Sequence, residues 1–300
     1  MPVGIGKEYR HLPVVQGDLK PPAGGAADLR GIRFGGRDPG KMDDSAFHRI
    51  VDHLGGSRRG YRKVRKGVKR RLERHMAGLG CRTVAAYLEA LERSAADMEA
   101  ARRLMTVPIS RFFRDRVLWA QLRDPVLPTL LDRFGVPLHV WSAGCACGEE
   151  AYSFRILWEK MLPGVPPRIL ATDLMPERIE RAEAGLYPRG SMKEIPEALL
   201  PRWFEELEGG RGYRVREAVR SGIRWQCLDI EAIECRSPFH IVFLRNSILT
   251  YDRPPKRDRV LARVRECVAR GGVVIVGSHE RLPDPDGRFE RWFPWIYRLR

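Results

Sequence analysis

The fold of this chain is decided by one stretch, Val140-Trp141-Ser142-Ala143-Gly144-Cys145-Ala146-Cys147-Gly148-Glu149-Glu150-Ala151-Tyr152-Ser153. It begins within an apolar strand, passes through small residues and restarts as a helix at Glu149. Several apolar residues of this predicted helix recur at helical spacing, among Tyr152, Phe154, Ile156, Leu157 and Met161. A strand, a tight turn of small residues and a helix start form the usual nucleotide cradle. Glycine lets the backbone approach a ligand, and free N–H groups at a helix start favour polar or anionic groups.

The composition of the turn indicates which nucleotide it suits. Only Gly144 and Gly148 are glycine, so the G-x-G-x-x-G pyrophosphate fingerprint is absent and a dinucleotide is disfavoured. Two carboxylates, Glu149 and Glu150, stand where a phosphate would bind. They suit a ligand that carries positive charge and hydroxyl groups, and S-adenosylmethionine has both.

The same stretch resembles the loop W-S-A-x-x-x-T-G-E-E-P-Y-S of the CheR-type chemoreceptor glutamate methyltransferases. Further family motifs follow in the expected order. Ser110-Arg111-Phe112-Phe113-Arg114 resembles T-x-F-F-R, and the strand up to Arg245-Asn246 resembles P-F-D-x-I-F-C-R-N. The resemblance runs from about Phe47 to Arg300. It implies a divergent member of the family, with an α/β Rossmann-like domain that uses S-adenosylmethionine, a small all-α N-terminal domain and a small inserted β-subdomain.

Composition and charge limit the class of protein. A hydrophobic fraction of 43% and a charged fraction of 31% are those of a soluble globular protein. We find no apolar run of membrane-spanning length and no signal peptide, and the six cysteines show no extracellular framework. We therefore expect a cytoplasmic monomer without membrane insertion, and we interpret Cys145-x-Cys147 as small-residue packing with no metal. The net charge of +16 favours acidic partners.

Four segments are predicted along the chain. Residues 1–41 are rich in Gly and Pro and are expected to be a disordered extension. Residues 42–106 form a basic all-helical domain, and residues 107–136 a linker and helical connector. Residues 137–300 alternate between strands and helices, including a helix over Pro255–Arg270 and an inserted subdomain at about 187–216 that is helical over Glu197–Leu207. This alternation predicts a mostly parallel sheet covered by helices, with the ligand at the carboxyl ends of the strands.

The most basic element is predicted to be one amphipathic helix from Arg58 to Arg74, in which a single acid, Glu73, interrupts ten bases. Its apolar residues Val64, Val68, Leu72 and Met76 recur every fourth position. The helix is either an ordinary solvated face or a working electrostatic surface. The resemblance favours the second, because an acidic, Glu-rich receptor helix needs a docking face. The candidate docking residues are Arg62, Arg65, Lys66, Lys69 and Arg70.

Asp173 stands at the end of the second predicted strand, where a carboxylate accepts hydrogen bonds from ribose hydroxyls and can also cap the following helix. The resemblance implies further contacts. Glu150 would contact the methionine part of the cofactor, Asp229 and Ile230 would flank the adenine, and Arg114 would be the catalytic residue that steers the acceptor carboxylate. The full predicted cofactor set is Ser110, Arg114, Ala143, Glu150, Asp173, Asp229, Ile230, Arg245 and Asn246.

Departures from the family pattern fall inside its motifs, at Pro108, Cys147, Ala151, Asp229 and Thr250. Thr250 occupies the position of an active-site tyrosine, and Tyr251 follows it. On a strand Tyr251 would point to the opposite face, whereas in a loop it could substitute. Two alternatives therefore remain: a regulatory protein that binds S-adenosylmethionine or S-adenosylhomocysteine with weak turnover, and an RNA methyltransferase. The charge favours the latter, but base-binding motifs and zinc knuckles are absent from the sequence.

Overall fold

The computed structural model describes residues 42–107 and 110–300. The predicted extension 1–41 and the departure at Pro108 therefore lie outside the described residues. The boundaries proposed at 107 and 137 stay predictions.

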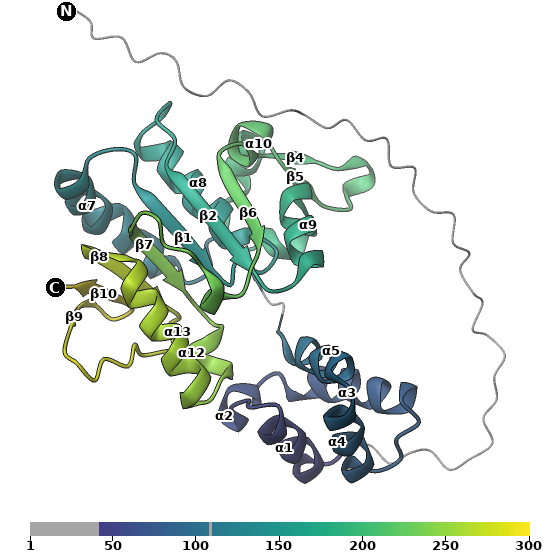
Figure 1. Ribbon diagram of the computed structural model, residues 1–300. Coiled ribbons are helices and arrows are strands. Elements are labelled where there is room, and N and C mark those ends of the chain that lie inside the picture. The colour runs from purple at the N-terminus through teal and green to yellow at the C-terminus, as the bar shows by residue number, and fades with distance from the viewer. Residues whose placement is uncertain (1–41, 108–109) are drawn as a thin grey trace, which may run out of the picture. The chain divides into compact units, whose positions relative to one another are not determined.

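The N-terminal part is all-helical, as predicted (Figure 1). All of its described helices except the one that starts at Arg65 begin at side-chain caps: Asp43 accepts a hydrogen bond from the Ala46 amide at 2.7 Å, and Ser57, Thr83 and Ser94 cap in the same manner. Phe47, Leu72 and Tyr87 fill the core between the helices. The elements are α1 (Asp44–His53), α2 (Arg58–Tyr61), α3 (Arg65–Gly78), α4 (Val84–Arg93) and α5 (Ala95–Met105).

The prediction of a single helix from Arg58 to Arg74 is wrong. The chain leaves α2 after Tyr61 and starts α3 at Arg65. Two long-range contacts explain the break. Tyr61 is buried in the helical core, and Gly60 lies so close to the Thr250 carbonyl that a Cβ there would meet that oxygen at 2.1 Å. The position of α2 is thus set by a contact that periodicity along the helix does not reveal.

Backbone atoms join the helical part to a distant segment of the chain. The Ser57 amide donates to the Tyr251 carbonyl at 2.7 Å, and the Arg253 amide donates to the Gly55 carbonyl at 3.2 Å. Gly56 and Asp252 form an antiparallel bridge between these bonds. We call this pairing of residues 55–57 with 251–253 the backbone seam.

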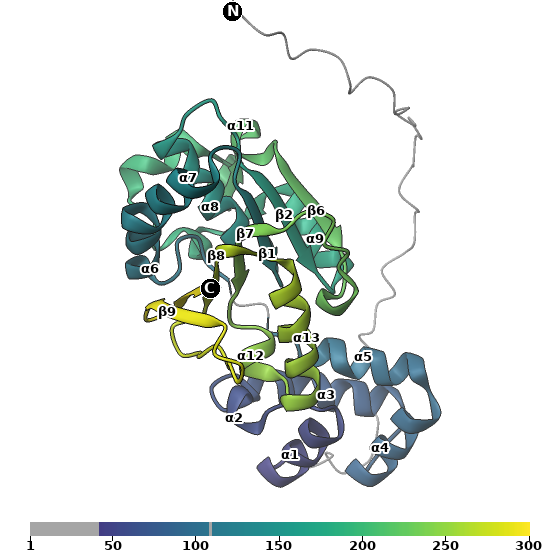
Figure 2. The same cartoon turned by 60° about the vertical axis from the view of Figure 1, so that its left-hand side comes forward.

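Among the described residues, the central sheet has seven strands in the order β6-β2-β1-β7-β8-β10-β9 (Figures 1 and 2). The first five strands of this order are parallel, and the β9–β10 hairpin closes the sheet antiparallel to β8. The predicted fold class is confirmed. The strands are β1 (His139–Ala143), β2 (Arg168–Asp173), β6 (Ile223–Cys227), β7 (Phe239–Leu244), β8 (Val268–Val276), β9 (Phe289–Phe293) and β10 (Ile296–Leu299).

Both faces of the sheet are covered, because side chains alternate along each strand. Val140 of β1 packs with α6, α7 and α8, whereas Trp141 packs with α13 on the other face. A further helix, α9, follows β2. These helices are α6 (Arg116–Gln121), α7 (Leu127–Phe134), α8 (Glu149–Met161), α9 (Pro176–Ala184) and α13 (Pro254–Cys267).

Two helix ends differ from the prediction. The inserted subdomain was expected to be helical over Glu197–Leu207, but α10 (Leu200–Trp203) ends before Phe204. Phe204 is buried against Phe112 and starts β4 (Phe204–Glu206), which pairs with β5 (Tyr213–Val215) beside β3 (Leu186–Tyr187). Similarly, α13 was expected to reach Arg270, but Val268 already pairs with Phe239 in the sheet. Tertiary burial overrides local helix propensity at both positions.

Candidate functional site

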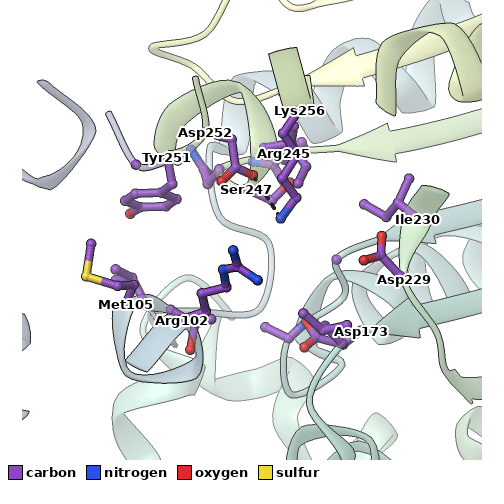
Figure 3. Close-up of a pocket in the computed structure, with 18 of the residues that line it drawn as sticks. Arg102, Met105, Asp173, Asp229, Ile230, Arg245, Ser247, Tyr251, Asp252 and Lys256 are labelled. Carbon is purple, nitrogen blue, oxygen red and sulfur yellow. Dashed lines mark hydrogen bonds and ion pairs between the residues drawn. The ribbon is translucent and has the colours of Figure 1, made fainter. Parts of the chain in front are cut away.

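A cavity of about 700 Å³ opens at the carboxyl ends of β1, β2, β6 and β7 (Figure 3). This is the position that the alternating fold predicts for a ligand. Its walls are the turn after β1, the end of β2, the loop after β6 and the segment after β7. Helix α5 and the residues of the backbone seam close the remaining side.

The turn after β1 is held by β2. The amides of Gly144 and Cys145 both donate to the Thr172 carbonyl at 2.9 Å, and the Ala146 amide donates to the Asp173 carboxylate at 2.9 Å. Gly144 and Ala146 have positive φ angles of 81° and 50°. Gly148 has a different task from the one predicted. It does not line the cavity, and a Cβ there would meet Trp225 at 2.7 Å, so this glycine permits packing beneath the turn.

Asp173 lies at the end of β2 and lines the cavity, as the ribose prediction requires. It is 5% exposed, and one carboxylate oxygen accepts from the Met175 amide at 3.1 Å and contacts Arg178 at 3.4 Å. The other oxygen holds the Ala146 amide. Asp173 therefore fixes the turn and the start of the next helix while its carboxylate faces the cavity.

Glu150, Arg245 and Asp115 form a buried ion network at the cavity wall. Glu150 accepts from the Ser142 hydroxyl at 2.7 Å and from Arg245 at 3.0 Å. Arg245 also contacts Asp115 at 2.7 Å and donates to the Arg114 carbonyl at 3.2 Å. The guanidinium of Arg245 is thus engaged with protein groups, which makes it a positioning residue for Glu150 and Arg114.

Arg114 is held in a strained linker. Its neighbours Phe113 and Asp115 have positive φ angles of 52° and 66°, a conformation that costs roughly 1–2 kcal/mol for each non-glycine residue. The indole of Trp119 donates to the Arg114 carbonyl at 2.8 Å. Strain of this kind persists only where surrounding contacts over-determine it. The linker therefore fixes the backbone of Arg114 at the edge of the cavity.

Thr250 and Tyr251 do not lie on a strand. They belong to α12 (Ile248–Tyr251), and only Tyr251 lines the cavity. Thr250 donates to the buried Glu280 carboxylate, whereas the Tyr251 ring packs 5.0 Å from that of Tyr61. Burial raises the pKa of Tyr251, and the nearby Arg114 charge opposes that shift. The departure at Thr250 thus leaves a tyrosine in the cavity near Arg114.

Asp229 and Ile230 both line the cavity after β6, as expected for residues beside an adenine. Asp229 accepts from the Glu231 amide at 2.9 Å and so caps the short helix Ile230–Ala232. Ser110 and Asn246 line the cavity as well. Ala143 does not, because it ends β1 and is buried beneath the turn.

Glu149 is placed differently from Glu150. It is buried away from the cavity, and burial raises the pKa of its carboxyl group against the opposing hydrogen bonds from Ser110 and Ser191. Burial likewise raises the pKa of the Cys145 and Cys147 thiols. Only one of the two predicted acids, Glu150, therefore lines the cavity.

The sequence did not reveal several residues of the site. Glu280 accepts from the Gly277 amide at 2.7 Å and from the Asn246 amide at 2.9 Å, which supports the positive φ of Asn246. A carboxylate directly after Gly-Ser-His was the available signal. Four further cavity residues carry no sequence signal for this role: Arg102, Met105, Arg178 and Ser247.

The predicted docking residues divide into two groups. Arg65 and Lys69, on α3, both contact Asp44, at 2.6 Å and 2.5 Å. Arg62, Lys66 and Arg70 are exposed, and among the described residues they have no ion-pair partner. In the described part of the chain, no helix is long and apolar enough to cross a membrane, and no His, Cys, Asp or Glu cluster has a metal-binding arrangement.

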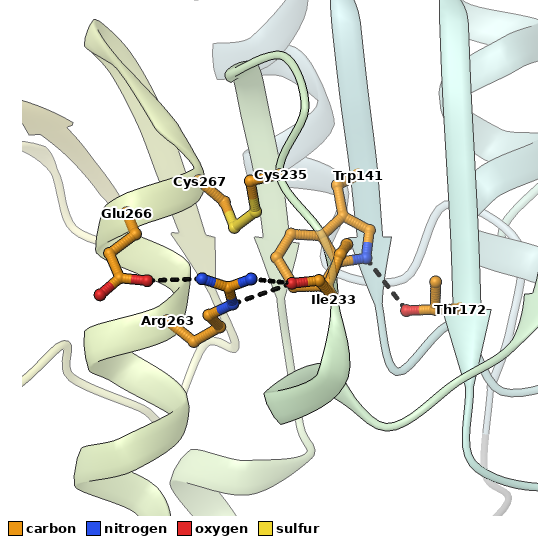
Figure 4. Close-up of a disulfide and its surroundings, with 7 residues drawn as sticks. All are labelled: Trp141, Thr172, Ile233, Cys235, Arg263, Glu266 and Cys267. Atoms are coloured by element: carbon orange, nitrogen blue, oxygen red, sulfur yellow. Dashed lines mark hydrogen bonds and ion pairs between the residues drawn. A yellow bond between two sulfur atoms is a disulfide. The ribbon is translucent and has the colours of Figure 1, made fainter.

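The loop that carries Asp229 and Ile230 is fastened to α13. Cys235 forms a disulfide with Cys267, and Arg263 donates to the Ile233 carbonyl at 2.9 Å (Figure 4). Arg259 contacts Glu231 at 2.8 Å. The cysteine pairing was not predicted, because the two residues are 32 positions apart without a recognisable framework. The disulfide therefore supports one wall of the cavity.

Replacing Cys235 by serine is expected to lower the free energy of unfolding by roughly 2–4 kcal/mol, because the cross-link restricts the unfolded chain. Affinity for S-adenosylhomocysteine should fall several-fold as the loop loosens. Urea unfolding and calorimetry measure the two effects, and dithiothreitol should make the wild type behave like the variant. The control is Cys227→Ser, which removes an exposed free thiol at the end of β6. Equal unfolding midpoints for wild type and Cys235→Ser would contradict the prediction.

A doubly wound sheet with an acid at the end of β2 and a cavity at the switch in strand order is the arrangement of an α/β protein that binds a nucleotide or nucleoside ligand. Comparison with known proteins identifies the family. Residues 109–294 match the model of the CheR methyltransferase S-adenosylmethionine-binding domain. The chain therefore belongs to the CheR methyltransferase family, and the predicted family, fold and cofactor are confirmed.

Individual relatives support the same family. A chemotaxis protein methyltransferase of Listeria monocytogenes is 32% identical over 203 residues, which cover 68% of this chain and 76% of that protein. Its counterpart in Listeria innocua is 31% identical over the same shares of both chains. An uncharacterized 104.1 kDa protein of Rhodobacter capsulatus is 33% identical over 221 residues, 72% of this chain but 23% of its own length.

Proposed function

We propose that this methyltransferase transfers the methyl group of S-adenosylmethionine to glutamate side chains of a chemoreceptor-like protein in the cytoplasm, acting as a monomer. The products are glutamyl methyl esters and S-adenosylhomocysteine. The observation that carries the proposal is the position of Arg114, a fixed cation beside the cavity of a CheR-family chain. Tyr251 beside it supports turnover over a purely regulatory role.

The cavity residues fit the cofactor. The cavity volume of about 700 Å³ accommodates a nucleoside with an amino-acid tail, and the Asp173 carboxylate suits ribose hydroxyls. Glu150 would hold the positively charged methionine part, with Ser110, Arg114 and Asn246 close by. Asp229 and Ile230 would contact the adenine. Arg245 would act through Glu150. When bound, the cofactor supplies an electrophilic methyl group on a sulfonium.

The chemistry asks little of the protein beyond orientation. A glutamate carboxylate is already ionised at pH 7, so no general base is required. Arg114 orients the carboxylate by charge-assisted hydrogen bonds, and enclosure by α5 and α12 excludes water. Proximity alone can account for several kcal/mol of barrier reduction, on the order of 7–11 kcal/mol in the best oriented cases.

The test is transfer of labelled methyl from S-adenosylmethionine to a receptor cytoplasmic fragment. The expected product is base-labile label on glutamate. Base-stable label on RNA would support the RNA methyltransferase instead. Tight binding of S-adenosylhomocysteine without any transfer would support the regulatory alternative, which the replacement of the family tyrosine by Thr250 motivates.

We propose that the acceptor docks as an acidic helix on Arg62, Lys66 and Arg70, while Asp44 partly offsets the charges of Arg65 and Lys69. Reversing Arg62, Lys66 and Arg70 to glutamate should slow association about tenfold at low salt and flatten its salt dependence, because exposed charges act through steering. Stopped-flow binding measures the rate, and cofactor affinity should not change.

The matched control reverses three exposed arginines on strands, Arg168 on β2, Arg214 on β5 and Arg224 on β6, which have no ion-pair partner among the described residues. It changes the net charge equally. If both triple variants respond identically to salt, net charge and not the α3 face controls association, and the docking proposal fails.

A further inference from the structure

Most positive side chains that line the cavity already hold an acid. Among the described residues, these pairs are Arg178 with Asp173, Arg245 with Glu150 and Asp115, Arg253 with Asp52, Lys256 with Asp252, and Arg259 with Glu231. A cationic group that already contacts a protein carboxylate has fewer donors left for a ligand. Much of the positive charge in the cavity is therefore paired with carboxylates of the protein itself.

Arg102 differs from these residues. It lines the cavity from α5, is exposed, and has no ion pair or hydrogen bond among the described parts of the chain. Its neighbour Arg103 is engaged instead, with Glu99 at 3.5 Å. Figure 3 shows the Arg102 side chain extending into the cavity in the space between Tyr251 and Asp173.

The backbone that carries Arg102 is firmly held. Ala101 and Met105 are buried in the helical core on either side of it. Arg71 donates to the carbonyls of Leu104 and Thr106, each at 2.9 Å, and so caps the end of α5. A charged group on a rigid element restricts where a bound carboxylate can lie, because less conformational freedom is lost on binding.

We propose that Arg102 positions the carboxylate of the acceptor glutamate, together with Arg114. This inference rests on the proposed function. The planar fork of an arginine suits a carboxylate, which it can hold through two parallel hydrogen bonds. A second carboxylate, that of the cofactor's methionine part, has the same chemistry. However, the predicted cofactor residues lie on the linker and at the strand ends, whereas Arg102 comes from the helical part.

The experiment compares Arg102→Gln, Arg102→Lys and the control Arg103→Gln in the full chain, with a receptor fragment as acceptor. Arg102→Gln should raise the acceptor KM about tenfold or more, the value of one charge-assisted contact, while kcat changes less than about threefold. Arg102→Lys should be intermediate, since it keeps the charge without the fork. Arg103→Gln should match the wild type. The Kd of S-adenosylhomocysteine should stay within about twofold for all three.

A second readout separates the carboxylate from the rest of the acceptor. Fragments with Glu or Gln at the methylated position are compared as ligands. The wild type should prefer the Glu fragment, and in Arg102→Gln this preference should fall about tenfold, leaving the part that Arg114 supplies. An unchanged preference in Arg102→Gln overturns the inference. So does a loss of S-adenosylhomocysteine affinity with unchanged acceptor KM, because Arg102 would then hold the cofactor's carboxylate. If the wild type methylates no glutamate, the proposed function fails first, and the inference falls with it.

Discussion

Replacement of Asp173 by asparagine is expected to weaken the binding of S-adenosylhomocysteine by about 100-fold, or close to 3 kcal/mol. The carboxylate stands at the end of β2, where it can accept from two ribose hydroxyls, and hydrogen bonds to a charged acceptor contribute about 1.5–3 kcal/mol each. Asparagine retains the shape but only one acceptor oxygen. Its amide group would also face the Ala146 amide, which now donates to Asp173 at 2.9 Å. Calorimetry with the product measures the loss.

The matched control for Asp173 is Glu231→Gln. Glu231 is another acid at the cavity wall, but its partner is Arg259, which is 61% exposed. Its replacement should change the affinity by less than about twofold, because exposed ion pairs contribute little. Thermal unfolding with and without product separates lost binding from lost folding. If Asp173→Asn bound S-adenosylhomocysteine with wild-type affinity, Asp173 would not be a cofactor-binding residue.

Replacement of Arg245 by methionine is expected to lower the free energy of unfolding by about 3–5 kcal/mol, because it leaves Glu150 and Asp115 without their common partner. The side chain of Arg245 is only 4% exposed, and those of Glu150 and Asp115 are 13% and 22% exposed, so water can replace only part of the lost contacts. Urea unfolding measures the change. Cofactor affinity should fall as well, since Glu150 and the Arg114 carbonyl both lose a donor.

Two further variants serve as controls for Arg245→Met. Arg259→Met breaks the exposed pair with Glu231 and should cost no more than about 1 kcal/mol. The double variant Arg245→Met with Glu150→Gln removes one of the stranded charges and should recover part of the loss. If Arg245→Met and Arg259→Met destabilise equally, the buried network has no special role in stability.

Much of the fold could be predicted because its signals are local. The apolar run before Gly144 and the helical spacing after Glu149 are both read within one element, and the structure places β1 and α8 there. Errors arose where a distant contact decides the outcome. Gly60 against the Thr250 carbonyl ends α2, and the burial of Phe204 against Phe112 starts β4. Neither contact produces a periodic pattern in the sequence.

The site was predictable to a similar extent and for the same reason. Asp173 carries a positional signal, an acid at the end of a strand, and it lines the cavity. The engagement of Arg245 with Glu150 spans 95 positions, and the disulfide spans 32. The cofactor roles of the individual residues stay predictions. Arg102 was missed because one arginine among many in a basic helical domain is not distinguished by its neighbours.

The backbone seam bears on how this enzyme can diversify. It is made by main-chain atoms of residues 55–57 and 251–253, which side-chain substitutions other than proline retain. If the acceptor docks on α3 as proposed, mutations on the outer surface of that helix can exchange one acceptor for another while this main-chain frame beside the cavity persists. Glycines are the exception: at Gly60 any larger residue would collide with the Thr250 carbonyl, Gly56 packs closely against Tyr61 and Val51, and Gly55 has a positive φ of 76°. The proposed recognition surface can thus vary, whereas the glycines in and beside the seam cannot be replaced without strain.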